Sequence, residues 1–179
     1  MKSLTLLRHA KSGLDNPALR DFDRPLNARG QKAARKMGAH AHDRLMIFDW
    51  VVASPALRVE ETLGIFLAEL EPPRPDPVWD RRAYLASAAT LLDIIRETPD
   101  DAKHLLLAGH NPGIEELALR LAEGQRDTVY ASLEEKYPTG ALACLRLDCI
   151  SWSDAGFGTG TLERFVRPRD IDPTLGPEY

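Results

Sequence analysis

Residues 4–12 read LTLLRHAKS, and this stretch decides the fold of the chain. Its apolar residues predict a buried strand over Leu4–Leu7, which ends abruptly in Arg8-His9. Two cationic-type groups at the end of a buried strand need a reason, because charge is costly to bury. In an open α/β sheet, ligands bind at the carboxyl ends of the strands. The Arg-His pair at such an end therefore points to phosphate chemistry.

The composition is that of an ordinary globular protein. The chain has 179 residues, of which 44% are hydrophobic and 28% charged, and this length predicts one domain over residues 1–179. The formal net charge of -4 predicts no bulk attraction to nucleic acid or to an anionic membrane. No apolar run approaches a membrane span and no long apolar leader opens the chain, which favours a cytoplasmic protein.

The two cysteines, Cys144 and Cys149, are expected to be structural thiols in a reducing compartment. They form no Cys-x-x-Cys motif. A cysteine phosphatase needs an arginine six residues after its cysteine, and here those positions hold Ile150 and Ala155. Phosphate chemistry based on a cysteine nucleophile is therefore excluded.

Strand-like and helix-like segments alternate along the chain. Strands are expected at residues 4–7, 49–53, 77–80, 103–108, 140–147 and 161–166, and helices at 27–44, after 54, at 88–97, after 111 and at 127–136. This alternation predicts an α/β fold: a three-layer αβα sandwich with a mainly parallel central sheet and an antiparallel edge strand. The tail over 168–179 is expected to lie on the surface.

Two helices are predicted to begin with a capping residue followed by proline, at Ser54-Pro55 and at Asn111-Pro112. Arg58 falls in the first turn of the earlier helix, where a cation is unfavourable for the helix dipole. Arg58 is thus badly placed for stability and well placed for an anion. His110 directly precedes the later helix and follows the strand over 103–108.

Four side chains are expected to converge, because parallel strands end at the same rim of a sheet. A neutral imidazole such as His9 can attack phosphorus, and neighbouring guanidiniums favour its neutral form by like-charge repulsion. Arg8 and Arg58 can hold a phosphoryl group through paired hydrogen bonds. His110 can supply a further hydrogen bond or a proton, and Ser12 is another candidate contact for the phosphoryl group.

The segment Arg8-His9-Ala10 resembles the Arg-His-Gly signature of the histidine phosphatase superfamily, which has the phosphoglycerate mutase-like fold. Arg58 and His110 match the other catalytic arginine and histidine of that family, and Asp23-Arg24-Pro25-Leu26 resembles the small SixA-type phosphohistidine phosphatases. The resemblance implies that His9 is the phosphorylated nucleophile. It also implies that Arg8, Arg58 and His110 line a pocket for a phosphate or sulfate ion, with no metal or cofactor. Ala10 stands where the family commonly has glycine.

The expected substrate is phosphohistidine displayed on another protein. The resemblance implies a glutamate proton donor in the sugar-phosphate members, but the corresponding region, residues 80–90, offers Asp80 and no glutamate. A phosphohistidine leaves as an imidazole from a labile P–N bond, which needs less acid assistance than an alkoxide. Two alternatives stay open: a phosphatase for a small phosphate ester with Asp80 as the acid, and a module that binds phosphoproteins without turnover.

Overall fold

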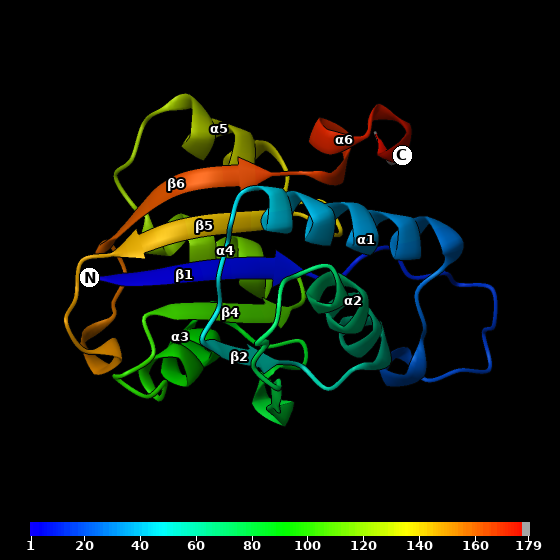
Figure 1. The fold of residues 1–179 in the computed structure, drawn as a ribbon, viewed down its shortest axis with the longest axis horizontal. Coiled ribbons are helices and arrows are strands. Elements are labelled where there is room, and N and C mark those ends of the chain that lie inside the picture. Colours follow the sequence, from blue (N-terminus) through cyan, green and yellow to red (C-terminus); the bar gives the residue numbers. More distant parts are fainter. Residues whose placement is uncertain (177–179) are drawn as a thin grey trace.

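A six-stranded sheet forms the centre of the computed structural model, which describes residues 1–176 (Figure 1). Its order is β3-β2-β4-β1-β5-β6, with β1 (Lys2–Arg8), β2 (Trp50–Ala53), β3 (Val78–Trp79), β4 (His104–Gly109), β5 (Leu142–Leu147) and β6 (Gly160–Val166). Strands β1 to β4 pair in parallel, whereas β5 is antiparallel to both β1 and β6. The predicted antiparallel pair at one edge is confirmed, and within it β5 runs against the rest of the sheet.

Helices cover both faces of this sheet, which confirms the three-layer prediction (Figure 1). One face carries α1 (Ala28–Asp43) and α2 (Leu57–Ala68), and the other carries α3 (Ala88–Arg96), α4 (Gly113–Leu121) and α5 (Thr128–Glu135). Shorter pieces are α6 (Pro168–Ile171) and the 3-10 helices η1 (Asp21–Asp23), η2 (Arg81–Ala83), η3 (Trp152–Asp154) and η4 (Pro173–Leu175). The C-terminal segment packs against α1 through α6, and residues 177–179 lie outside the described part.

Alternate residues of the central strands face the two helical layers, because successive side chains of a strand point to opposite faces. In β1, Leu4 and Leu6 join the core beneath α3, α4 and α5, whereas Leu7 joins the core beneath α1 and α2. Strand β4 repeats this pattern. Both strands are buried on both faces, which explains why their sequences are continuous apolar runs.

Helices α2 and α4 begin later than predicted. Helix α2 starts at Leu57, because Ser54 donates its backbone N–H to the carbonyl of Ala108 and so still belongs to the sheet. Helix α4 starts at Gly113. The N-caps are therefore Ala56 and Pro112 and not the predicted Ser54 and Asn111, whereas Asn27 caps α1 as predicted. The side chain of Asn111 still accepts from the backbone N–H of Glu115 in the first turn of α4, at 3.2 Å.

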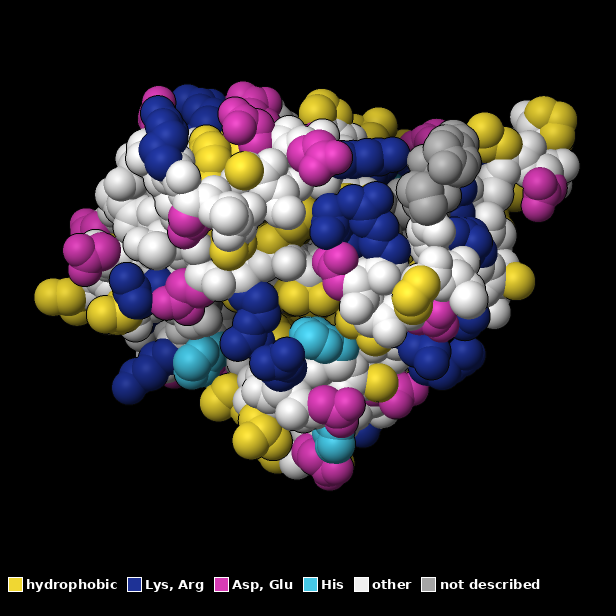
Figure 2. Space-filling view, turned by 90° about the horizontal axis from the view of Figure 1, so that it is seen from above, with side chains coloured by type: hydrophobic (Ala, Val, Ile, Leu, Met, Phe, Trp, Pro, Cys, Tyr) yellow, Lys and Arg dark blue, Asp and Glu magenta, His cyan; other side chains and the backbone are white. Residues whose placement is uncertain are grey.

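The described surface is mixed in charge, and no helix within residues 1–176 is long and apolar enough to cross a membrane. Lys and Arg side chains are interspersed with Asp and Glu on the face seen from above (Figure 2). Cys144 is half-buried and Cys149 is buried, and both are free thiols whose pKa is raised by burial.

Gly30 lets α1 begin in close contact with the segment that follows β1. A Cβ atom at this position would lie 2.1 Å from the carbonyl oxygen of Lys11. The same oxygen accepts a hydrogen bond from the backbone N–H of Asn27 at 3.1 Å. The start of α1 is thereby attached to the chain just after His9, so this glycine helps to position the end of β1.

We expect Gly30→Ala to lower the free energy of unfolding by about 1–3 kcal/mol, because the added methyl group overpacks a backbone contact. Gly64 is a matched control, since it is exposed within α2 and an added Cβ would meet nothing within 4 Å. Gly64→Ala should raise the free energy of unfolding by about 0.5–1 kcal/mol. Urea unfolding measures both changes. An unchanged stability of Gly30→Ala would contradict the close approach of Gly30 to the Lys11 carbonyl.

Candidate active site

His9 lies directly after β1, at the carboxyl edge of the sheet. Its backbone N–H donates to the carbonyl of Gly109 at 3.1 Å, and its own carbonyl accepts from the amide of Gly140 at 2.9 Å. The residue is 8% exposed, and its Nδ1 lies 2.7 Å from the carbonyl oxygen of Ala10. A carbonyl oxygen can only accept, so Nδ1 carries the proton and the lone pair lies on Nε2. Nε2 is therefore the nucleophilic atom of this ring.

His110 lies next to His9, with the two ring centroids 5.3 Å apart. Its Nδ1 lies 3.2 Å from Nη2 of Arg58, and its Nε2 lies 2.8 Å from the hydroxyl oxygen of Ser54. A guanidinium can only donate, so Nδ1 accepts from Arg58 and Nε2 donates to Ser54. Both rings are thus neutral, and the proton lies on Nδ1 in His9 and on Nε2 in His110.

Burial keeps both imidazoles uncharged near neutral pH. Desolvation, opposed by the hydrogen bond to Ala10 and assisted by the charges of Arg58 and Arg8, lowers the pKa of His9 to about 4. Desolvation also lowers the pKa of His110 to about 3, with the charge of Arg58 as the next cause. An unprotonated ring is the form that can attack phosphorus.

Arg58 lies in the first turn of α2, as predicted, and is 2% exposed. Its Nη1 donates to the carbonyl of Asp21 at 2.7 Å, and its Nη2 donates to Oδ2 of the same residue at 3.0 Å. Its Nε is buried and has no hydrogen-bond partner within residues 1–176. A buried donor of this kind is costly unless an acceptor satisfies it, and an oxygen of a bound anion would do so.

Arg8 ends β1 and completes the predicted cluster. Its Nη1 donates to the carbonyl of Tyr137 at 2.8 Å, and the buried Tyr137 hydroxyl donates to the carbonyl of Leu6 at 2.6 Å. The charge of Arg8 contributes to the lowered pKa of both imidazoles. The structure therefore brings together the two histidines and two arginines that the sequence singled out.

Ser12 does not make a contact with this cluster in the structure. Its hydroxyl donates to the carbonyl of Pro25 at 2.9 Å and accepts from Nη1 of Arg24 at 3.1 Å. It ties two parts of the loop after β1 together, and its contact with phosphate stays a prediction.

Asp80 is engaged elsewhere as well. Its carboxylate accepts from Nη2 of Arg82 at 2.7 Å and from the backbone N–H of the same residue at 2.9 Å. The hydrogen bond from the Arg82 side chain is the main cause of its lowered pKa. Asp80 is thus ionised near neutral pH and is a poor proton donor.

Several residues outside the predicted cluster support it. Asp21 contacts Arg58, and the ring of Tyr84 lies edge-on to that of His110 at 5.3 Å. The Thr62 hydroxyl accepts from the amide of Ala10 at 3.0 Å and donates to the Arg58 carbonyl at 2.6 Å. Thr62 follows Arg58 by one helical turn, and this spacing could have identified it. No local pattern marks Asp21 or Tyr84.

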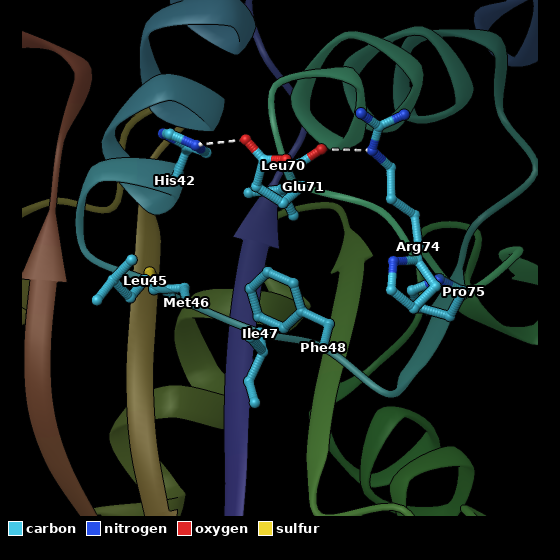
Figure 3. Close-up of a pocket in the computed structure, with 10 residues that line it drawn as sticks. His42, Leu45, Met46, Ile47, Phe48, Leu70, Glu71, Arg74 and Pro75 are labelled. Atoms are coloured by element: carbon cyan, nitrogen blue, oxygen red, sulfur yellow. Dashed lines mark hydrogen bonds and ion pairs between the residues drawn. The ribbon is translucent and has the colours of Figure 1, made fainter.

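A separate apolar hollow of about 160 Å³ is shown in Figure 3. It is lined by the end of α1 and by the loops that follow α1 and α2, where Glu71 lies between His42 and Arg74. These loops lead into the amino ends of β2 and β3, so the hollow lies at the edge of the sheet opposite to the paired imidazoles.

A family model described as histidine phosphatase superfamily (branch 1) matches residues 4–104, a segment that contains Arg8, His9 and Arg58. The uncharacterized protein Rv1276c of Mycobacterium tuberculosis (strain ATCC 25618 / H37Rv) is 33% identical over 165 residues. The match covers 91% of this chain and 100% of that protein.

Two solved structures, both provisionally assigned as the phosphohistidine phosphatase SixA, have a similar fold. The one from Agrobacterium tumefaciens is 29% identical with a TM-score of 0.79, and the match covers 93% of this chain and 98% of the other. The one from Nakamurella multipartitia is 26% identical with a TM-score of 0.81, and the match covers 93% of this chain and 96% of the other.

The two buried imidazoles should make the protein less stable in mild acid. Their pKa values lie below the usual 6.5, at about 4 for His9 and about 3 for His110. Between these values and 6.5 the unfolded chain therefore binds more protons than the folded chain. We expect the free energy of unfolding to fall as the pH drops from about 6.5 towards 4, and to fall less steeply in His9→Asn.

His42 is a control because its pKa is shifted in the opposite direction, upwards. It is half-buried, and the hydrogen bonds that it donates to the carboxylates of Asp43 and Glu71 raise its pKa, so its contribution to stability is fully present below pH 6.5. His42→Asn should therefore remove a gain in stability that occurs as the pH drops towards 6.5, and should leave the decline between pH 6.5 and 4 unchanged. Urea unfolding at a series of pH values measures the slopes, and identical slopes in wild type and His9→Asn would contradict the neutral buried ring.

Proposed function

This chain belongs to the histidine phosphatase superfamily, and from that premise we propose that it removes phosphate from phosphohistidine in proteins through a covalent phosphoryl group on His9. The observation that carries the proposal is the unprotonated Nε2 of His9, next to a second neutral imidazole and two guanidiniums. The two similar SixA structures support the choice of substrate.

The reaction has two steps at one nitrogen. Nε2 of His9 forms a bond to phosphorus while the bond from phosphorus to the leaving nitrogen breaks, and that nitrogen keeps the electron pair. Water then attacks the phosphoryl group on His9, which returns the ring to its neutral form and releases inorganic phosphate. Arg58 Nε–H and the Arg8 guanidinium stabilise the charge on the phosphoryl oxygens in both steps.

The leaving group favours phosphohistidine over a phosphate ester. An alkoxide needs a proton from an acid as it departs, and the one carboxylate in the corresponding region, Asp80, is ionised by its bond to Arg82. An imidazole protonated on its far nitrogen departs as a neutral molecule. Because residues 80–90 offer no carboxylic acid that can donate a proton, hydrolysis of esters should be slowed more than hydrolysis of phosphohistidine.

We expect rapid-quench labelling with a phosphorylated substrate to find acid-labile, alkali-stable phosphate on His9. His9→Ala should lower kcat by at least about a thousandfold, because no other group can form the intermediate. His104→Ala is the matched control, since His104 lies at the amino end of β4, and its activity should equal that of the wild type. Label on another residue, or none during turnover, would refute the mechanism.

We expect a phosphohistidine protein and phosphoramidate to be hydrolysed with kcat/KM at least about a hundredfold above that of sugar phosphates, in buffer that contains a chelator. This ratio corresponds to about 2.7 kcal/mol of transition-state stabilisation. Asp80→Asn should leave both rates unchanged. Faster turnover of an ester, lost in Asp80→Asn, would instead establish the ester phosphatase, and phosphopeptide binding without phosphate release would establish a binding module.

A further inference from the structure

Asp21 holds the outer edge of the Arg58 guanidinium. Its carbonyl oxygen accepts from Nη1 at 2.7 Å and its Oδ2 accepts from Nη2 at 3.0 Å, so one residue engages both terminal nitrogens. Nη2 also reaches Nδ1 of His110 at 3.2 Å. On the inner edge the buried Nε–H has no hydrogen-bond partner in the described chain. The guanidinium is therefore held from outside with its inner edge available to an anion.

Asp21 is itself fixed from two other sides. The Tyr84 hydroxyl donates to Oδ2 at 2.5 Å, and Arg24 donates to Oδ1 from Nη2 at 2.9 Å and from Nε at 3.1 Å. The Tyr84 ring lies edge-on to both Phe22 and His110, at centroid distances of 5.1 and 5.3 Å. Asp21 thus joins the loop after β1, the loop after η2 and helix α2 at the mouth of the site.

The burial of the two partners is unequal. The Arg58 side chain is 3% exposed, whereas that of Asp21 is 45% exposed. Exposed ion pairs contribute little to stability. An almost buried arginine, however, needs hydrogen-bond partners that orient its guanidinium and balance its charge. A guanidinium assists phosphoryl transfer only in a narrow range of orientations, and a misplacement of about 1 Å can cost about a hundredfold in rate.

We propose that Asp21 is a positioning residue for phosphoryl transfer, which holds the outer edge of the Arg58 guanidinium so that its Nε–H faces the phosphoryl group. This inference rests on the proposed function, since it assigns Arg58 to the phosphoryl oxygens. Asp21 acts only through Arg58 and does not itself contact the phosphoryl group. Tyr84 keeps the carboxylate in place through its hydroxyl.

A double-mutant cycle tests this role, with any phosphorylated substrate that the wild type turns over. Asp21→Ala should lower kcat/KM by about ten- to a hundredfold in the wild-type background and by less than about twofold in the Arg58→Ala background. Asp21→Asn keeps an acceptor for Arg58 and Tyr84, so it should lose only about three- to tenfold. Tyr84→Phe should lose a similar amount for lack of the hydroxyl.

Asp23→Ala is the matched control. Asp23 lies in the same 3-10 helix, and its carboxylate pairs with the exposed Arg20, so its removal should change kcat/KM by less than about twofold. Urea unfolding of each variant checks the fold, and Asp21→Asn carries the comparison if Asp21→Ala does not fold. Equal losses from Asp21→Ala in both backgrounds would overturn the proposal and show a merely structural role.

Binding of inorganic phosphate, followed by calorimetry, gives a readout that does not need turnover. Phosphate should bind more weakly to Asp21→Asn than to the wild type, and no more weakly in Arg58→Ala/Asp21→Asn than in Arg58→Ala. Tighter binding to Asp21→Asn would overturn the proposal, since it would show a carboxylate that competes with the anion. If the wild type prefers an ester, the proposed substrate fails while this cycle still decides the role of Asp21.

Discussion

The hydrogen bond from Arg58 to Nδ1 of His110, 3.2 Å long, is the contact on which the site depends. It joins the start of α2 to the end of β4, and it requires an accepting nitrogen because a guanidinium only donates. The proton of His110 must then lie on Nε2, which donates to Ser54. Protonation of this ring would put two buried positive charges in contact. The charge of Arg58 adds to the desolvation that lowers the pKa of both imidazoles, and Asp21 compensates this buried cation from its outer side.

The sheet supplies the geometry that makes this contact possible. In the parallel register, Arg8 is level with Gly109 of β4, and Ala53 of β2 is level with Ala108. The residues that follow these strands therefore emerge at the same height, and the backbone of His9 bonds directly to that of Gly109. Loops added to such an edge can carry reactive side chains while apolar strands supply the rigidity. Here the apolar layers on both faces keep the ends of β1, β2 and β4 in register.

Local charge at the site differs from that of the whole chain. The formal net charge is -4, yet Arg8, Arg24 and Arg58 all act on His9 and lower its pKa. A phosphoryl group would thus enter a positive region inside an acidic protein, and Asp21 offsets part of the positive charge from the outer side of Arg58. The negative charge of Asp80 is balanced by Arg82 and not by the arginines of the site. This separation of carboxylates from the nucleophile suits the transfer of a dianionic group to a neutral imidazole.

The sequence by itself determined the layers, the strand ends and the four central side chains. Apolar runs mark buried strands, and Arg8-His9, Arg58 and His110 each follow such a run within a few residues, so local pattern was sufficient. Only the tertiary structure decided where α2 begins and that Asp21 reaches Arg58, 37 positions away. The first depends on a backbone bond between neighbouring strands, and the second on the path of an irregular loop. Neither leaves a periodic signal, because periodicity records which face of an element is buried and says nothing of contacts between distant segments.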